Sequence, residues 1–281
     1  MREFDDARLS GKTPLEQARI VQLKLLDVFV RICDEHNLRY WLDYGTLLGA
    51  MRHDGFIPWD DDLDVSMPLT DYKKFLQIAP ALLPKTVLLQ DLRKTPGACF
   101  SFAKLRDRSS FFCEAETVVS VPCGIFIDIF PWICAPRLPR RFINRWCHFQ
   151  YSCLRHAGAA LARPRANAGV KMLDCCVSLG WKAAYWLAYA AFSLMRILFP
   201  SRVWRAQQDS YSTYYVEEER LFPLRRHIFV GKEYNVPCDA DYVLRKEYGD
   251  WRTLPSEENR IYHATIISAV MTPPHVSWAL E

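Results

Sequence analysis

Residues 40–64 decide the fold of this chain, and they read YWLDYGTLLGAMRHDGFIPWDDDLD. The aromatic-rich start of this stretch predicts a short strand over 38–42. Gly45 follows the strand, and the apolar residues after it predict a short helix over 46–52. After a loop that carries glycine and proline, residues 63–67 predict a second strand. This order of strand, glycine turn, helix and strand is typical of an α/β or α+β domain.

Three acids of the stretch lie at alternate positions: Asp60, Asp62 and Asp64. Side chains alternate in an extended chain, so these three are predicted to share one face. Carboxylates placed together repel each other unless a cation neutralises them. Oxygen ligands suit Mg²⁺ or Mn²⁺, which also bind substrate phosphates. The alternative interpretation is a solvated acidic loop.

Two neighbouring features favour the metal site. Gly45 and Thr46 lie between a strand and a helix, where backbone N–H groups can approach a phosphate and the helix N-terminus favours an anion. Asp128 is a single carboxylate in the apolar predicted strand 124–130, which is costly unless it is paired or metal-bound. It is a candidate third metal ligand or general base; the alternative is an aspartate hydrogen-bonded to backbone. Together these features indicate a nucleotidyltransferase-type site that uses two divalent ions.

The rest of the first half continues the mixture of helices and strands. The spacing of apolar residues predicts a helix from about Leu15 to His36, capped by Thr13 and Pro14, and another from Thr70 to about Ile78. Further strands are predicted at 86–90 and 98–106, before the strand at 124–130, with Pro131 ending the pattern. We therefore expect an α/β (α+β) core with a mixed sheet over residues 1–135, and a mostly helical region over 136–281.

Composition narrows the classes of protein. Half of the residues are apolar and 24% are charged, as in a folded globular protein. A net charge of +4 without a recognisable binding motif predicts no nucleic-acid partner. The acidic start, residues 1–6, does not resemble a secretory signal. The ten cysteines form no C-x-x-C pair, which favours reduced thiols in a cytoplasmic protein.

Residues 138–165 are rich in arginine and aromatic side chains, and residues 170–199 are strongly apolar. Between Cys175 and Met195 the only charged residue is Lys182. A buried or interfacial helix is favoured over a membrane span, because a span needs about 20 apolar residues and a central lysine opposes insertion. We expect peripheral, salt-sensitive contact with the inner face of a membrane. The alternative is an ordinary helical hairpin with a solvated basic face.

The 40–64 stretch as a whole resembles the signature of the LicD family of phosphocholine transferases, which is related to fukutin. The resemblance continues through Asp71, Tyr72 and Phe75, through FAKLRD at 102–107 and IDIFP at 127–131, and returns in the C-terminal part at Tyr248-Gly249-Asp250, Leu254-Pro255, Arg260 and His263. Its strong part covers about residues 15–132, and 138–235 carries no matching motif. One departure is Asp43-Tyr44, where family members often carry small residues; it narrows the expected donor pocket.

The resemblance implies a nucleotidyltransferase core and metal-dependent transfer of a phospho-alcohol from a CDP-linked donor to a sugar hydroxyl. It implies Asp62, Asp64 and Asp128 as the catalytic, metal-binding carboxylates, with Asp60 as a supporting ligand. It also implies groups for the donor phosphates: Gly45, Thr46, Lys104 and Arg106. Supporting roles are implied for His53, His263 and Arg260.

The transferred alcohol is predicted from the aromatic residues. A quaternary ammonium is recognised by aromatic faces, and Tyr44 and Trp59 lie within one residue of the expected phosphate and metal positions. We therefore expect transfer of phosphocholine from CDP-choline onto a cell-surface glycan such as lipopolysaccharide or teichoic acid. A lipid-linked glycan is a candidate acceptor. The alternatives are glycerol phosphate, ribitol phosphate or phosphoethanolamine by the same chemistry, or an inactive scaffold for glycan assembly at a membrane.

Overall fold

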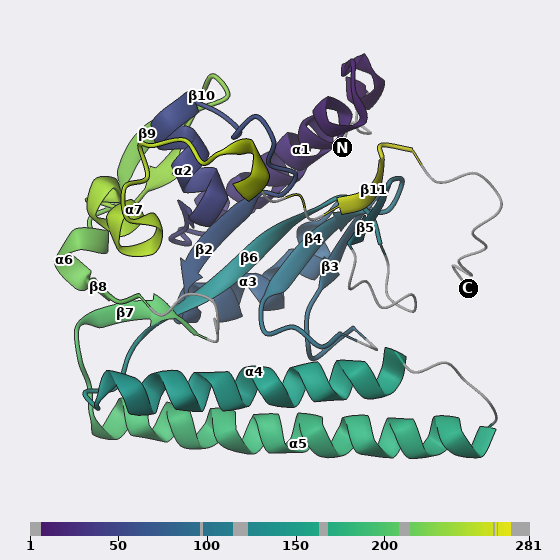
Figure 1. Ribbon diagram of the computed structural model, residues 1–281, viewed down its shortest axis with the longest axis vertical. Helices are drawn as coiled ribbons and strands as arrows, with labels where there is room; N and C mark the ends of the chain where they lie inside the picture. The colour runs from purple at the N-terminus through teal and green to yellow at the C-terminus, as the bar shows by residue number, and fades with distance from the viewer. Residues whose placement is uncertain are drawn as a thin grey trace.

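The computed structural model describes residues 7–95, 98–114, 123–162, 168–207, 214–260, 262 and 264–270 (Figure 1). The helices are α1 (Pro14–Glu35), α2 (Tyr44–His53), α3 (Leu69–Leu82), α4 (Arg140–Ala162), α5 (Ala168–Leu198), α6 (Glu218–Leu221) and α7 (Ala240–Tyr248), with 3-10 turns η1 (Ala7–Ser10) and η2 (Glu257–Asn259). The strands are β1 (Trp41–Leu42), β2 (Asp64–Pro68), β3 (Val87–Gln90), β4 (Ala103–Asp107), β5 (Phe111–Glu114), β6 (Phe126–Cys134), β7 (Val203–Ala206), β8 (Val216–Glu217), β9 (Arg225–Phe229), β10 (Lys232–Val236) and β11 (Ala264–Ser268). The expected mixed α/β architecture is confirmed.

Local capping explains where the first helices begin. The Thr13 side chain accepts a hydrogen bond from the backbone N–H of Glu16 at the start of α1, as the sequence predicts. Helix α2 begins at Tyr44, two residues before the predicted start, because the Asp43 side chain caps it by accepting from the Tyr44 N–H. The predicted strand over 38–42 is correspondingly reduced to β1.

The main sheet has seven strands, with β1, β2, β6, β4 and β3 side by side in that order. Strands β2 and β6 run parallel and the other pairs are antiparallel, so the predicted mixed sheet is confirmed. Strand β7 joins the same sheet beside the end of β6, and β8 pairs with β7. Two small sheets, β9–β10 and β5–β11, complete the strands. The second half of the chain therefore adds strands to the sheet that the first half builds.

The prediction that Pro131 ends the strand is wrong, since β6 continues to Cys134. The Asp128 N–H donates to Leu63 on the β2 side, so the odd-numbered residues of β6 turn their N–H groups to the opposite side. On that side Pro131 lies between the last residue paired with β4, Ile129, and the first paired with β7, Trp132. The Pro131 carbonyl oxygen accepts the Gln207 N–H at 2.9 Å, so β6 keeps one hydrogen bond to the adjacent segment here although Pro131 has no N–H to donate.

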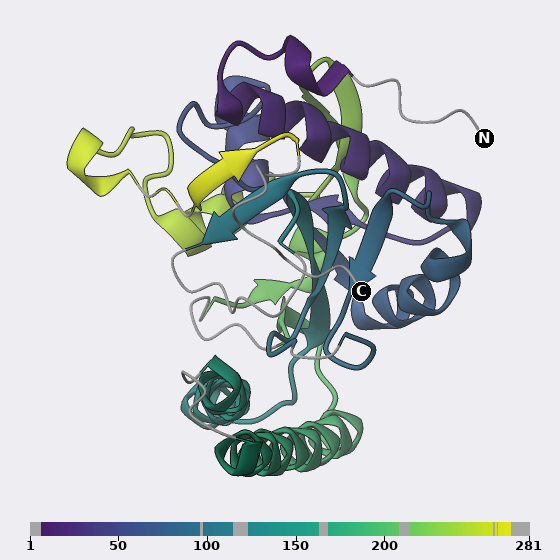
Figure 2. The same cartoon turned by 90° about the vertical axis from the view of Figure 1, so that its right-hand side faces the viewer.

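Helices α4 and α5 form a long antiparallel hairpin that lies along the sheet, on the side away from α1 (Figures 1 and 2). The inner faces meet through small clusters, one around Ile143 and Phe192 and another around Leu154 and Tyr185. None of the described helices is long and apolar enough to cross a membrane. All ten cysteines are free thiols, as expected.

Candidate active site

Three charged side chains lie in one row across three neighbouring strands. Asp64 begins β2 and pairs in register with Asp128 on β6, and Asp128 pairs in register with Lys104 on β4. Residues directly opposite each other in a sheet project from the same face. The Lys104 Nζ atom lies 3.0 Å from a carboxylate oxygen of Asp128, and both side chains are largely buried. The register thus brings together residues that are 24 and 64 positions apart in the chain.

Within this row, the pKa of Asp64 is strongly shifted. Burial, with the negative charges of Asp62, Asp128 and Asp60, raises the pKa of Asp64 well above its usual value. A carboxyl surrounded by like charges resists ionisation, and a bound cation reverses that effect. The local charge therefore favours a positively charged ligand beside Asp64.

The loop before β2 adds three more carboxylates. Asp60, Asp61 and Asp62 each offer one oxygen within 4.8 Å of the others. Helix α1 holds this loop, because the Arg19 guanidinium donates to the backbone oxygen of Asp60 at 2.9 Å and the Gln22 amide donates to that of Asp61 at 2.7 Å. The loop is thus fastened to the core.

Asp61 is a residue that sequence reasoning missed. The alternation argument treats 60–64 as extended strand, whereas β2 begins only at Asp64 and the acids before it lie in a loop. Asp61 is nearly fully buried, and one of its oxygens accepts the backbone N–H of Ala264 at the start of β11. No periodicity in the sequence signals that contact, because the two residues are 203 positions apart.

The N-terminal turn of α2 lies against the acidic loop. A Cβ atom added to Gly45 would lie 2.7 Å from a carboxylate oxygen of Asp60, so only glycine admits that carboxylate without displacement. The Thr46 hydroxyl accepts the backbone N–H of Asp64 at 2.8 Å, which ties the helix to the first residue of β2. Gly45 and Thr46 therefore both lie against the acidic residues.

Asp43 lies beneath this turn and is completely buried. Burial raises the pKa of Asp43 to about 7, although hydrogen bonds from the Ser66 hydroxyl and the Tyr44 N–H favour the charged form. Its backbone N–H donates to the Asp64 carbonyl oxygen, so the cap of α2 and the start of β2 are one connected unit.

A group of partly exposed aromatic rings borders the charged row. Tyr44 packs on Phe130 with ring centroids 4.9 Å apart, and Phe102 packs on Phe130 at 4.6 Å. Phe130 follows Asp128 by two residues on the same face of β6, and Lys104 lies over the Phe102 ring at 5.3 Å. Tyr44 has φ +47°, a left-handed conformation that favours glycine. The tyrosine ring is therefore held beside the carboxylates at a cost in backbone strain.

The other residues to which the family resemblance assigns a role lie at several places around the carboxylates, and some have protein partners of their own. The face of Trp59 is covered by the Arg260 guanidinium, 4.4 Å from the ring centroid. The Arg106 side chain is buried, with its donors directed to Gln90 and to the Gly124 carbonyl oxygen. His53 lies at the far end of α2 from Gly45 and accepts a hydrogen bond from Arg52. His263 lies outside the described residues.

The C-terminal part returns to the site through α7. Burial and the charges of Glu247, Asp64 and Asp43 raise the pKa of Tyr248, the last residue of α7, although 42% of this residue stays exposed. The Arg52 guanidinium also donates to the Trp251 carbonyl oxygen at 2.9 Å. The Tyr248-Gly249-Asp250 motif is therefore placed near the acids by tertiary contacts.

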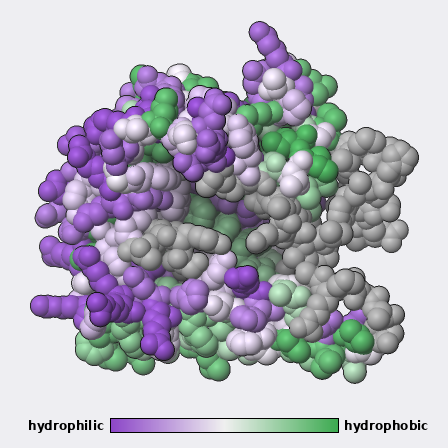
Figure 3. All heavy atoms as spheres, in the orientation of Figure 1, coloured by the Kyte–Doolittle hydropathy of each residue, from purple (hydrophilic) through white to green (hydrophobic). Residues whose placement is uncertain are grey.

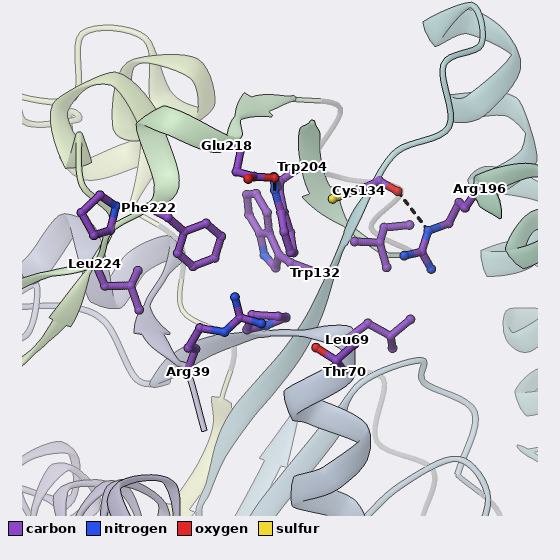
Figure 4. A pocket seen from close by; sticks show the side chains of 13 residues that line it. Arg39, Leu69, Thr70, Trp132, Cys134, Arg196, Trp204, Glu218, Phe222 and Leu224 are labelled. Carbon is purple, nitrogen blue, oxygen red and sulfur yellow. Dashed lines mark hydrogen bonds between the residues drawn. The ribbon is translucent and has the colours of Figure 1, made fainter. Parts of the chain in front are cut away.

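A cavity of about 680 Å³ lies elsewhere, at the opposite ends of β2 and β6 (Figure 4). Its wall includes Arg39, Trp132, Trp204, Glu218 and Phe222, and it contains none of the predicted site residues. Its residues Pro68 and Trp132 lie four positions beyond Asp64 and Asp128, about 13 Å along the strands. The predicted site residues therefore lie outside this cavity.

The donor set fits a divalent ion. Asp60, Asp61 and Asp62 present clustered carboxylate oxygens, the ligands that Mg²⁺ and Mn²⁺ prefer. Burial, together with the neighbouring negative charges, raises the pKa of Asp64. Asp62 and Asp64, with Asp60 and Asp128, are the residues that would hold such an ion. Fold and site together define an α/β protein with a cluster of acidic side chains beside its main sheet.

Comparison with known proteins finds similarity to one family. Residues 37–150, about two fifths of the chain, match the model of the LicD/FKTN/FKRP nucleotidyltransferase domain. Lipopolysaccharide cholinephosphotransferase LicD of Haemophilus influenzae is 45% identical over 67 residues, which are 24% of this chain and 25% of that protein. Human Ribitol 5-phosphate transferase FKRP is 48% identical over 42 residues, 15% of this chain and 8% of its own length.

A yeast relative aligns over a longer segment. Mannosyltransferase regulator 4 of Saccharomyces cerevisiae is 30% identical over 136 residues, 46% of this chain and 11% of that protein. The chain thus spans about a quarter or less of the length of these relatives. The similarity is concentrated in one domain.

Proposed function

We propose that this protein is a metal-dependent phosphotransferase that moves a phospho-alcohol from a CDP-linked donor to a hydroxyl group of a glycan. The observation that carries the proposal is a cluster of three carboxylates, Asp60, Asp61 and Asp62, next to the N-terminal turn of α2. It leads directly into β2, where Asp64 pairs in register with Asp128. The two linked phosphates of the donor carry negative charge that must be neutralised during transfer. Divalent ions held by clustered carboxylates neutralise that charge. The names of the bacterial and human relatives support the same reaction class.

Each residue has a role in that reaction. Asp62 and Asp64 would hold the metal, with Asp60 and Asp128 completing its shell; a bound divalent ion neutralises the pyrophosphate and lowers the pKa of an attacking hydroxyl. Gly45 leaves room for the donor phosphate and for Asp60 at the helix N-terminus. Lys104, which lies 3.0 Å from Asp128, orients that carboxylate and adds positive charge close to the transferred phosphate.

The proposed step is a single displacement at phosphorus. The glycan hydroxyl oxygen forms a bond to the phosphorus that carries the alcohol, and the bond from that phosphorus to the bridging oxygen breaks. CMP leaves with the bridging oxygen and its electron pair. The hydroxyl proton passes to a carboxylate of the row, for which Asp128 is the proposed base. No oxidant or further reactant is needed.

The proposed donor is CDP-choline. The rings of Tyr44 and Phe130 are partly exposed beside the charged row and can contact a quaternary ammonium, whereas Phe102 already has Lys104 over its ring. A desolvated contact of this kind contributes about 2 kcal/mol, or about a thirtyfold preference. Trp59, the other ring that the sequence suggested, already has Arg260 on its face. The structure thus supports Tyr44 more strongly than Trp59.

Two other functions have specific support. Ribitol phosphate transfer is favoured by the name of the human relative, and glycerol phosphate or phosphoethanolamine would follow the same chemistry. A scaffold or regulator of glycan assembly is favoured by the name of the yeast relative. The clustered carboxylates argue for catalysis, because a scaffold has no use for buried charges that repel each other.

The test is CMP release from a panel of CDP-alcohols, with Mg²⁺ or Mn²⁺ and with EDTA. We expect metal-dependent turnover of CDP-choline above CDP-glycerol and CDP-ribitol, and its loss in Asp62→Asn. Asp34→Asn, which changes an exposed carboxylate of α1, is the matched control. Tyr44→Leu should reduce turnover of CDP-choline more than binding of CMP. Equal use of all donors would remove the choline proposal alone, and metal-independent turnover would remove the mechanism.

A further inference from the structure

Helix α5 is apolar on its outer side as well as on its inner side. Its outer residues include Leu187, 74% exposed, and Ile197, 75% exposed. The other large apolar residues of this outer face are also well exposed: Met172, Leu173, Leu179, Leu194, Leu198 and Phe199. Small exposed residues fill the gaps between them: Cys176, Gly180, Ala183 and Ala190. Exposed positions thus recur every three or four residues and form one stripe about 40 Å long. We call this stripe the α5 face.

The α5 face carries no charge along its length. From Met172 to Phe199 every residue classed as exposed is uncharged. Asp174 is buried, Lys182 is half-buried, and the Arg196 guanidinium is turned back to donate to the Cys134 carbonyl oxygen. A helix that is apolar all round is expected to be buried, and an exposed apolar patch of this size marks an interaction surface. The α5 face therefore requires a partner.

Helix α4 supplies the charge beside it. The residues before and within α4, 137–162, contain no acidic residue, and they expose a set of arginines: Arg137, Arg140, Arg141, Arg145 and Arg155. Two phenylalanines, Phe142 and Phe149, are exposed among them. Figure 3 shows hydrophobic residues along the lower edge of the molecule, over α4 and α5, with hydrophilic residues gathered above one end.

We propose that the α4–α5 hairpin docks on an anionic lipid surface, with the α5 face in the interfacial layer and the α4 arginines on the lipid phosphates. The charges select this partner over a second copy of the chain. Two copies joined through their α5 faces would bring together arginine-rich helices that have no acidic residue to pair with. Apolar residues with flanking arginines and exposed aromatic rings are typical of helices that lie in a membrane interface. The proposal is independent of the proposed reaction.

The first experiment is co-sedimentation of the full chain with phosphatidylcholine vesicles, with and without 30% phosphatidylglycerol. We expect binding to the anionic vesicles that weakens with salt and persists in part at high salt, because apolar contacts are not screened. Apolar burial also predicts weak binding to pure phosphatidylcholine. The measured quantity is the partition coefficient at each salt concentration.

Paired variants separate the two contributions. Leu187→Asp with Leu194→Asp should lower partitioning into both kinds of vesicle at least thirtyfold, since both side chains are exposed and the fold does not need them. Leu9→Asp with Ile228→Asp, at positions 61% and 50% exposed outside the hairpin, is the control and should bind normally. Arg141→Gln with Arg145→Gln should lower binding to anionic vesicles about thirtyfold and leave phosphatidylcholine binding unchanged.

Several results would overturn the proposal. It fails if the wild type binds no vesicle at low salt, or if the Leu187/Leu194 variant binds as well as the control. It also fails if the wild type is a dimer that this variant converts to a monomer without any vesicle binding, which would assign the α5 face to a second copy. Unchanged melting temperatures of all variants must accompany the supporting result, so that loss of binding is not loss of folding.

Discussion

Asp64 is the residue at which the charges of the site meet, since acids from the preceding loop and from β6 raise its pKa. A divalent ion should therefore stabilise the folded protein by binding there. We expect Mg²⁺ or Mn²⁺, at a hundredfold excess over Kd, to raise the melting temperature by about 5–10 °C. Asp64→Asn should remove this response, whereas Asp34→Asn should retain it. Equal metal responses in wild type and Asp64→Asn would contradict the assignment.

Asp43 provides a prediction about pH. Its pKa is raised to about 7 in the folded protein, from an ordinary value of 3.8, so the folded state holds its proton more tightly than the unfolded state. Stability linked to that proton is fully present below pH 3.8 and is lost as pH rises to about 7, by ~4 kcal/mol at most. Asn cannot ionise and retains a capping oxygen.

The measurement for Asp43 is the free energy of unfolding of wild type and Asp43→Asn in EDTA, from pH 5 to pH 8. We expect the difference, variant minus wild type, to rise with pH up to about 7 and then to level off. A difference that stays constant from pH 5 to pH 8 would show that Asp43 does not hold a proton in the folded protein.

At the scale of elements, helix α2 is positioned by two glycines that meet different neighbours. A Cβ at Gly45 would meet the Asp60 carboxylate, the mobile end of a side chain, whereas a Cβ at Gly49 would lie 2.4 Å from the Gly55 backbone oxygen. Gly45→Ala should therefore keep the fold, displace Asp60 and lower metal affinity. Gly49→Ala should destabilise the protein by about 2 kcal/mol or more, because backbone must move.

These two variants are each other's controls. Thermal melting in EDTA measures the stability effect, and metal titration of the folded protein measures the effect on the site. A Gly45→Ala variant that binds metal normally would show that contact between α2 and Asp60 is not needed. A Gly49→Ala variant as stable as wild type would show that the loop at Gly55 yields easily.

At the scale of the whole molecule, the hairpin leaves and rejoins the sheet at one place. The Ala135 N–H donates to the Val203 carbonyl oxygen at 2.7 Å, so the end of β6 and the start of β7 are already adjacent. The small apolar clusters of the hairpin are also separate from the main core. Replacing residues 138–200 with a short Gly-Ser linker should therefore leave the sheet folded.

The shortened protein should retain the metal-dependent rise in melting temperature and lose vesicle binding. The full chain is the reference for both measurements. Loss of the metal response, together with loss of cooperative melting, would show that the hairpin is an integral part of the catalytic fold. Retained vesicle binding would place the lipid contact on another surface.

Local sequence accounts for most of the elements of the first 135 residues. Thr13 and Pro14 predict the start of α1, and the glycine turn with the acids after it predicts the strand, helix and strand of residues 38–68. Such signals succeed because caps, turns and apolar periodicity act within a few residues. The error at Pro131 has the opposite cause: whether a missing N–H matters depends on which strands lie beside it.

The sequence by itself determined the mixed α/β class, the LicD resemblance and the identity of the clustered acids, because these depend on residue types at short spacing. Only the tertiary structure decided which of them meet. Strand register placed Asp128 beside Asp64 and Lys104. The Asp61 carboxylate accepts a hydrogen bond from the backbone N–H of Ala264, and the Arg106 guanidinium donates to the Gln90 side chain. The tertiary structure also left one apolar side of α5 exposed. The sequence could not predict which side, because the periodicity of an apolar helix does not show which face packs against a neighbour.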